Sequence, residues 1–280
     1  MQRITSPRNG PRSAAVHGNV MRQRSIDTNQ TPIKQLQADL QSLGIHAGDT
    51  LMVHASIRSV GPVEERGQGI LAALLGVLGP EGTLIAYADF EPTSKLPYFD
   101  IKRSPARPDY GVFAELVRTY PGAVRSANPG ASMVAIGAKA QWLCEQHSLN
   151  YGYGPDGPLG KLVSVGGKVL LLGSDLDQVT LLHLAEHIAD IPDKRVVKRP
   201  LDVMHDDGTV ESVMIEEFDT SNPVASSMPE KVFASIVGSF LVTGGASSGR
   251  VGQALSYLLP AKELVSYAVS VIERDYGRSL

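Results

Sequence analysis

Two histidines and a glutamate stand at helical spacing in the second half of the chain. In the segment 179–187, VTLLHLAEH, Glu186 follows His183 by three residues and His187 follows it by four. Residues three and four positions apart lie on the same face of a helix, so these side chains are expected to project together. They come shortly after an apolar, strand-like run, and sites in open α/β sheets lie at such strand ends. The pattern therefore marks a candidate catalytic site.

Two kinds of chemistry fit this face. In the first, Glu186 orients and charges His183, which acts as a general base, because imidazole is the side chain suited to proton transfer near neutral pH. In the second, the three residues form H-x-x-E-H, the motif of inverted zinc peptidases, in which both imidazoles bind Zn²⁺; Glu263 is then a candidate third ligand. A solvated face of an amphipathic helix is the remaining interpretation, and the spacing alone does not separate the three.

A second group of polar residues follows another apolar run. Residues 52–61 read MVHASIRSVG. A strand end followed by small polar residues offers backbone N–H groups to a phosphate, and Arg58 adds a cation. The segment lacks the glycine spacing of a Walker or dinucleotide motif, so a structural turn fits it equally well.

Acidic residues form a third group, divided between two loops. The proline-rich loop 89–110 contains Asp89, Glu91, Asp100 and Asp109. The region after a predicted hairpin contains Glu216, Glu217 and Asp219. If the two loops meet over one cleft, they would make an anionic pocket for a polycation. Solvated surface charge is the alternative interpretation for each residue.

The elements that must position these groups are short apolar strands alternating with helices. Strands are predicted at 51–54, 83–87, 132–136 and 168–172, and helices near 33–43, 68–77, 112–120, 178–189, 229–240 and 262–276. The first helix is expected to have Thr31 at its N-cap and Pro32 at its first position. A hairpin near 201–215 turns at Asp206-Asp207-Gly208. This order predicts an α/β fold with a central mixed β-sheet layered between helices and an added antiparallel hairpin.

Composition narrows the classes of function. The chain has 280 residues, of which 42% are hydrophobic and 20% charged, as in an ordinary globular protein. Its formal net charge of -3 gives no sign of general affinity for nucleic acid or anionic membranes, and no apolar run is long enough to span a bilayer. The single cysteine, Cys144, excludes an intramolecular disulfide and a cysteine-based zinc site, and its apolar surroundings favour a buried thiol.

The N-terminal segment differs in composition from the rest. Residues 1–30 are rich in Arg, Ser, Asn and Gln and lack the apolar core of a secretory signal. We expect them to be a disordered extension. Residues 31–280 are expected to form a single domain that works in the cytoplasm.

Several long blocks resemble the aminoglycoside N3-acetyltransferase family, whose antibiotic-acetyltransferase fold is unrelated to the GNAT fold. The blocks are LMVHASIRSVGPV (51–63), GPEGTLIAYADF (79–90), PGAVRSANPGASMVAIG (121–137), YGYGPDGPL (151–159), GGKVLLLGSDLDQVTLLHLAEHIADIPDKR (166–195), EEFDTSNP (216–223) and GRVGQALSYLLPAKELV (249–265). The resemblance implies an acyltransferase that moves acetyl from acetyl-CoA to the 3-amine of a deoxystreptamine ring. It also implies antibiotic resistance as the biological role.

The resemblance further implies roles for individual residues. The family pattern L-H-x-A-E makes His183 the catalytic histidine and Glu186 its partner; the position of His187 varies, so no metal is expected. Contacts to coenzyme A are implied for His54, Ala55, Ser56, Ser59, Val60, Gly61, Arg125 and Ser126. The resemblance also implies that the aminoglycoside pocket is lined by Tyr87, Asp109, Glu217 and Asp219.

Two positions depart from the family pattern. Asn128 stands where many members have His, and Gly157 stands where members usually have Ser. Three alternatives stay open: acetylation of a different amine, the zinc peptidase, and a binding protein without turnover, to which alone the two departures point. The accepted aminoglycosides and the assembly state, including a homodimer, are left open by the sequence.

Overall fold

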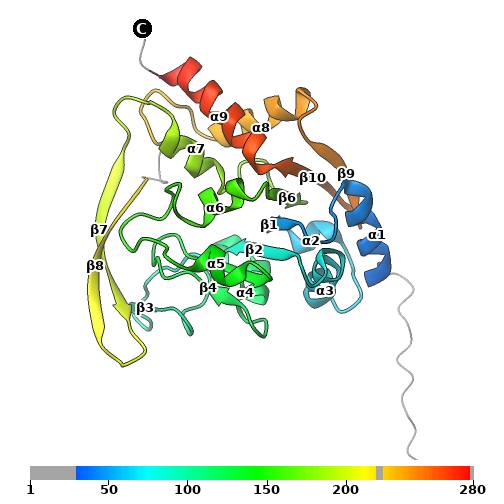
Figure 1. Cartoon of the computed structure of the whole chain (residues 1–280), viewed down its shortest axis with the longest axis horizontal. Helices are drawn as coiled ribbons and strands as arrows, with labels where there is room; N and C mark the ends of the chain where they lie inside the picture. The colour runs from blue at the N-terminus through cyan, green and yellow to red at the C-terminus, as the bar shows by residue number, and fades with distance from the viewer. Residues whose placement is uncertain (1–29, 219–222, 278–280) are drawn as a thin grey trace, which may run out of the picture.

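A seven-stranded mixed β-sheet lies at the centre of the molecule (Figure 1). The structure, a computed structural model, describes residues 30–218 and 223–277, so the expected N-terminal extension and Asp219 lie outside the described residues. The strand order is β4-β5-β2-β1-β6-β10-β9. The strands are β1 (Thr50–Ala55), β2 (Thr83–Tyr87), β4 (Val124–Arg125), β5 (Met133–Gly137), β6 (Lys168–Leu172), β9 (Ser247–Val251) and β10 (Ala254–Pro260).

The three central strands are parallel. β1 pairs in parallel with β2 on one side and with β6 on the other, whereas β5 and β10 add to them antiparallel. The carboxyl ends of β1, β2 and β6 therefore meet at one edge of the sheet. Such an edge is where open α/β sheets hold their ligands.

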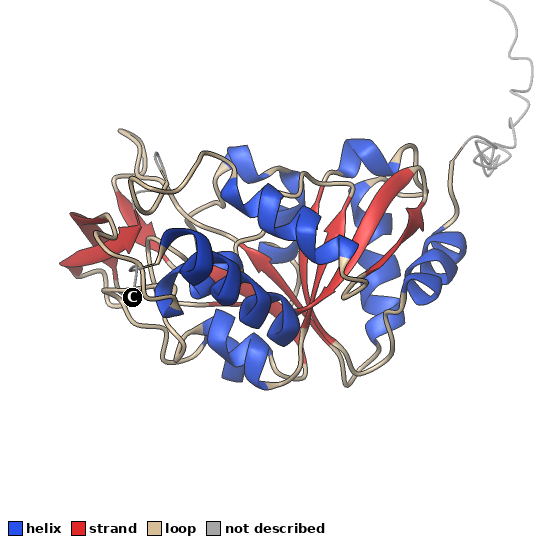
Figure 2. Cartoon of the chain, turned by 90° about the horizontal axis from the view of Figure 1, so that it is seen from above, coloured by secondary structure: helices blue, strands red, loops and turns tan. Residues whose placement is uncertain are grey.

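Helices cover both faces of this sheet (Figure 2). One face packs against α1 (Ile33–Leu43), α3 (Gly67–Leu78) and α4 (Val112–Arg118), and the other against α5 (Ala140–Cys144), α6 (Pro158–Ser164), α7 (Leu182–Ile188), α8 (Val232–Val242) and α9 (Ala261–Tyr276). Successive strand residues point to opposite faces, so Leu51 and Leu170 enter one core and Met52 and Leu171 the other. Burial on both faces explains why these strands are apolar throughout rather than alternating.

A separate three-stranded sheet stands at one end of the molecule (Figure 2). β7 (Val196–Met204) and β8 (Val210–Phe218) form a long antiparallel hairpin, and β3 (Tyr98–Asp100) pairs in parallel with β7. A small core of Phe90, Phe99, Val203 and Val213 lies under this sheet. The loop 89–110 is therefore fixed to the hairpin through β3.

The predicted fold class is confirmed, with differences in detail. The strands at 83–87 and 168–172 have the predicted bounds. The first helix differs at its start, because Pro32 is the N-cap and Thr31 instead bridges to Val63. The Ile33 N–H, which has no partner within the helix, donates to the Glu64 carboxylate at 3.1 Å.

Other features differ in extent or were not predicted. α7 begins at Leu182, four residues later than expected, because residues before it form a turn. β9, β10 and α6 were not predicted. Cys144 is buried as expected, and burial raises the pKa of its thiol to about 12. No helix in the described ranges is long and apolar enough to cross a membrane.

Candidate active site

A cavity of about 500 Å³ opens at the carboxyl ends of β1 and β2. Its lining comes from the strand ends, from α7, from the loop 89–110 and from the small sheet. The chemically active side chains among its lining residues include His54, Tyr87, Asp89, Arg107, Tyr153, His183, Glu186, Arg199 and Glu217. The sequence motifs that are far apart in the chain thus meet around one space.

His183 and Glu186 form a hydrogen-bonded pair on α7. His183 Nδ1 lies 2.7 Å from Glu186 Oε2, across the three-residue spacing predicted for this helix. The Glu186 side chain is 5% exposed and that of His183 is 19% exposed. A carboxylate only accepts hydrogen bonds, so Nδ1 carries the proton of the neutral ring and Nε2 carries the lone pair. The arrangement equips His183 to take a proton from a group bound in the cavity.

Aromatic rings hold the His183 imidazole. The rings of Tyr153 and Phe233 have centroids 4.7 and 5.0 Å from it, and that of Phe218 lies 6.3 Å away. Tight packing of this kind restricts the ring to one orientation. The His183 imidazole is therefore held in place by the protein itself.

His187 has a different partner from His183. Its Nδ1 lies 3.0 Å from the Tyr151 hydroxyl, and the centroids of the two rings lie 5.0 Å apart with the planes tilted by 39°. Among residues 30–218 and 223–277, no group of three or more His, Cys, Asp or Glu side chains has the arrangement of a metal site. Glu263, the nominated third zinc ligand, lies in the first turn of α9.

The end of β1 places a histidine and two serines near two cavities. His54 and Ala55 line the large cavity, and Ser59 lines a second cavity of about 440 Å³ together with Gly173 and Ser174. Ser56 Oγ and Ser59 Oγ are 2.7 Å apart. A ligand held along this segment would reach from one cavity to the other.

His54 is uncharged in this environment. Burial lowers the pKa of its imidazole to about 4. Its Nε2 is inaccessible to water and has no hydrogen-bond partner among the described residues. Unpaired buried nitrogens are rare in folded proteins, so His54 retains an unsatisfied hydrogen-bonding group beside the cavity.

Four residues expected at the coenzyme have other surroundings. Val60 is fully buried in the core, and Gly61, with φ +85°, packs against Gln253. Arg125 is buried against the Phe99 ring and hydrogen-bonds the carbonyls of Ser104 and Ala88, which ties the loop 89–110 to the main sheet. Ser126 Oγ accepts the Met133 N–H at 2.9 Å and lies 2.8 Å from His147 Nδ1. None of the four is among the described residues that line either cavity.

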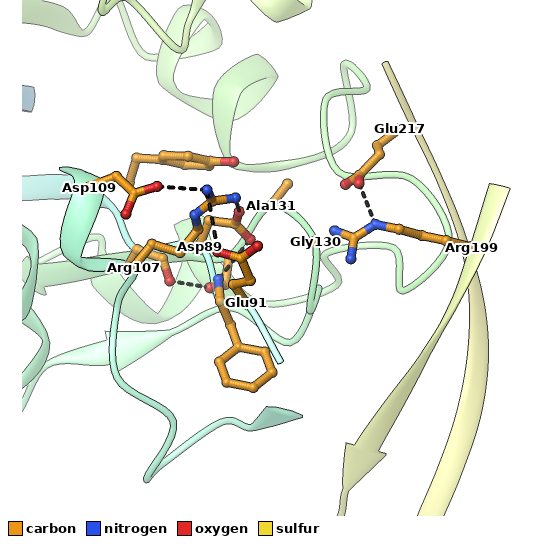
Figure 3. A network of polar contacts seen from close by, with 12 residues as sticks. Asp89, Glu91, Arg107, Asp109, Gly130, Ala131, Arg199 and Glu217 are labelled. Carbon is orange, nitrogen blue, oxygen red and sulfur yellow. Dashed lines mark hydrogen bonds and ion pairs between the residues drawn. The ribbon is translucent and has the colours of Figure 1, made fainter. Parts of the chain in front are cut away.

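Asp89, Arg107, Arg199 and Glu217 line one wall of the large cavity, and the exposed Glu91 and Asp109 lie beside Arg107 without being among the lining residues (Figure 3). Arg107 Nη2 lies 2.7 Å from Asp109 and 3.4 Å from Glu91, and its Nη1 lies 4.0 Å from Asp89. Across the space, Arg199 on β7 pairs with Glu217 on β8 at 2.6 Å. The predicted meeting of the two acidic loops is thus observed, but sequence analysis missed both arginines.

Burial changes the ionisation of Asp89 within this wall. Removal from water raises the pKa of its carboxyl to about 8, and the Glu217 charge adds to the rise, whereas the Phe90 N–H and Arg107 oppose it. Tyr87 lies nearby on β2, and its hydroxyl is 3.1 Å from that of Tyr153. Both phenols remain protonated, because burial raises their pKa values well above the usual range.

The two departures from the family pattern have structural explanations. Asn128 Oδ1 accepts the N–H groups of Gly130 and Ala131 at 2.8 and 2.7 Å, and its Nδ2 donates to the Ser148 carbonyl at 2.6 Å. Asn128 therefore stabilises a turn through bonds that use its amide fully. Gly157 is the N-cap of α6, a position where serine is also favoured because its hydroxyl can cap the helix.

The sequence resembles those of known proteins over most of its length. Residues 52–273 match the family model described as aminoglycoside 3-N-acetyltransferase. An aminoglycoside N(3)-acetyltransferase III from Pseudomonas aeruginosa is 40% identical over 255 residues, which cover 85% of this chain and 92% of that protein. The chain belongs to the aminoglycoside 3-N-acetyltransferase family.

Solved structures agree with this placement. The structure described as AAC-IIIb binary with CoASH has a TM-score of 0.85 and 43% identity, covering 89% of this chain and 99% of that chain. AAC-VIa bound to sisomicin has a TM-score of 0.83 and 31% identity, covering 89% and 100%. Membership of this acyltransferase family decides against the zinc-peptidase reading of the H-x-x-E-H motif.

Proposed function

We propose that this protein transfers acetyl from acetyl-CoA to the 3-amine of an aminoglycoside, with His183 as general base and Glu186 as its partner. The observation that carries the proposal is the 2.7 Å His183–Glu186 pair facing a cavity with an acidic wall, in a chain of this family. Because acetyl-CoA is made and used in the cytoplasm, the enzyme is proposed to act there.

The chemistry requires removal of a proton from the acceptor. An aminoglycoside amine is mostly protonated near neutral pH, and only the free amine carries a lone pair that can attack. His183 Nε2 accepts the amine proton as the nitrogen forms its bond to the acetyl carbon, and Glu186 stabilises the imidazolium. Acetyl-CoA supplies the activated acetyl group; its carbon–sulfur bond breaks as the amide forms, and the proton taken by His183 passes to the sulfur, so that CoA leaves as a thiol.

The region around the end of β1 suits the coenzyme. His54 and Ala55 line the cavity that holds His183, and Ser59 lines the neighbouring cavity. A pantetheine arm laid along this segment would carry the thioester into the large cavity. Ser56, hydrogen-bonded to Ser59, fits the same path.

The acidic wall suits the acceptor. Aminoglycosides carry several ammonium groups; Glu217 lines the cavity, and Asp109 lies at its rim, paired with the lining residue Arg107. Tyr87 also lines the cavity, and its hydroxyl stays protonated. We propose that these three residues hold the sugar rings while His183 faces the reacting amine; Asp219, proposed with them, lies outside the described residues.

The test is acetyl-CoA-dependent thiol release with gentamicin, kanamycin, tobramycin, neomycin and apramycin, against a control without drug. We expect turnover with several drugs and a fall in kcat of roughly 10²–10⁴ in His183→Ala. His187→Ala is the matched control, because that histidine lies one turn away and bonds Tyr151 instead. A His183→Ala variant with near-normal kcat would remove the base assignment. Turnover with other amines but none of these drugs would redirect the proposal to a different acceptor.

A further inference from the structure

We propose that Arg107 is an internal cation that occupies the place of a substrate ammonium, and that it sets which aminoglycosides bind by competing with them. The inference rests on the proposed function, since it concerns the affinity of the same cavity. It gives Arg107 a role in specificity. Arg107 lies in the loop 89–110, which contains neither residue of the proposed catalytic pair.

The position of Arg107 matches that of a bound cation. One guanidinium stands among Asp89, Glu91 and Asp109, at 4.0, 3.4 and 2.7 Å respectively, and its carbon lies 5.3 Å from the centre of the Tyr110 ring (Figure 3). Arg107 and Tyr110 line the cavity, with Glu91 and Asp109 just outside it, and carboxylates beside an aromatic face are the environment that ammonium groups favour. The protein thus provides its own occupant for this position.

Several donors of the Arg107 guanidinium have no hydrogen-bond partner among the described residues. A guanidinium has five N–H donors. Within the described residues, Arg107 makes one side-chain hydrogen bond, from Nη2 to Asp109, whereas its Nε is buried without a partner. The contacts to Glu91 and Asp89 are longer than hydrogen bonds. A cation that leaves donors unsatisfied is one that a better-matched cation can displace.

The backbone supports such an exchange. The Arg107 N–H donates to the Asp89 carbonyl at 2.9 Å, so the main chain stays fixed when the side chain moves. The Arg107 side chain is 27% exposed, which leaves it a route toward solvent. Arg199 differs from Arg107 in this respect, because its Nε donates a hydrogen bond to Glu217 at 2.6 Å.

The competition has a measurable consequence. Removing the Arg107 charge leaves Glu91 and Asp109 without their cation, so the drug should bind more tightly. A unit charge about 6 Å away, at an effective dielectric between surface and bulk values, changes affinity on the order of tenfold. The gain should grow with the number of drug amines and shrink as salt screens the charges.

The experiment is calorimetric titration of the full chain with kanamycin, tobramycin and neomycin, without acetyl-CoA, at low and high salt. We expect Arg107→Gln to lower Kd about tenfold at low salt, most strongly for neomycin, and Arg107→Lys to stay within about threefold of wild type because it keeps the charge. Arg103→Gln is the matched control; that arginine is 87% exposed and pairs with Asp100 at 3.7 Å. Equal or weaker drug binding by a folded Arg107→Gln variant overturns the inference.

A second measurement applies to the unaltered protein. In a crystal structure of the drug complex, we expect a drug amine to replace the Arg107 guanidinium at Asp109. A retained Arg107–Asp109 contact in that complex overturns the inference even if the variants do not fold. Failure of the proposed function is a separate result, because it is read from the absence of thiol release by the wild-type protein.

Discussion

Replacement of Glu186 by glutamine tests the catalytic pair with little change in shape. The substitution keeps the side-chain volume at a position that is 5% exposed, but removes the charge 2.7 Å from His183 Nδ1. Hydrogen bonds to a charged group contribute about 1.5–3 kcal/mol. If that energy is expressed when His183 becomes an imidazolium, kcat should fall about 10- to 150-fold, since each 1.4 kcal/mol is about a factor of ten.

The assay is thiol release at saturating acetyl-CoA and drug, so that kcat rather than affinity is compared. Glu263→Gln provides a matched control, because Glu263 lies on α9 rather than on the α7 face that carries His183. In a His183→Ala background, Glu186→Gln should have almost no further effect, since both changes remove the same interaction. A Glu186→Gln variant with wild-type kcat, or one whose loss adds fully to that of His183→Ala, would refute the reasoning.

Two further predictions concern stability. Gly157→Ser should raise the free energy of unfolding by a few tenths of a kcal/mol, because Gly157 is the N-cap of α6 with extended φ and ψ; a lowered Tm would contradict this. The pKa of Asp89 is raised from 3.8 to about 8 in the folded chain. Between about pH 4 and pH 8 the folded chain therefore keeps a proton that the unfolded chain has lost, and the free energy of unfolding falls as the pH rises through this range. The Tm of wild type should therefore fall relative to that of Asp89→Asn between about pH 4 and pH 8, and parallel Tm curves would count against the shift.

The sequence predicted the parts of the fold in which local pattern and tertiary environment agree. The runs at 83–87 and 168–172 are apolar because both faces of the central sheet are covered, and their bounds follow directly. His183 and Glu186 were predictable as a pair because helical spacing alone brings them together. The α/β class followed from the same alternation of elements.

The missed elements are those whose signal is not local. β9 and β10 form a hairpin whose two-residue turn contains Gly252, with φ +57°; that glycine between two short runs was the available signal. β9 reads SSGRV, which has little apolar character because much of it is exposed at the sheet edge. α6 is a short helix whose N-cap is a glycine, so the usual capping signal was missing.

Arg107 shows a different limit of sequence reasoning. Its three carboxylate partners lie within 18 residues of it, yet the loop has no periodicity that would orient any of them. Their convergence depends on β3 pairing with β7, about a hundred residues later in the chain. No local rule predicts a contact of that kind, and the same holds for the Arg199–Glu217 pair across the hairpin.

The separate core beneath the small sheet bears on how such an enzyme adapts. Phe90, Phe99, Val203 and Val213 support the wall that carries the arginines and carboxylates, whereas α7 and its catalytic pair pack into the large core of the main sheet. We therefore expect most substitutions in the wall to leave the His183–Glu186 pair in place, with Phe218 of β8 as the exception, because its ring lies 6.3 Å from the His183 imidazole. Under changing antibiotic pressure, selection can remodel which drugs are inactivated through one module while the other conserves the reaction itself.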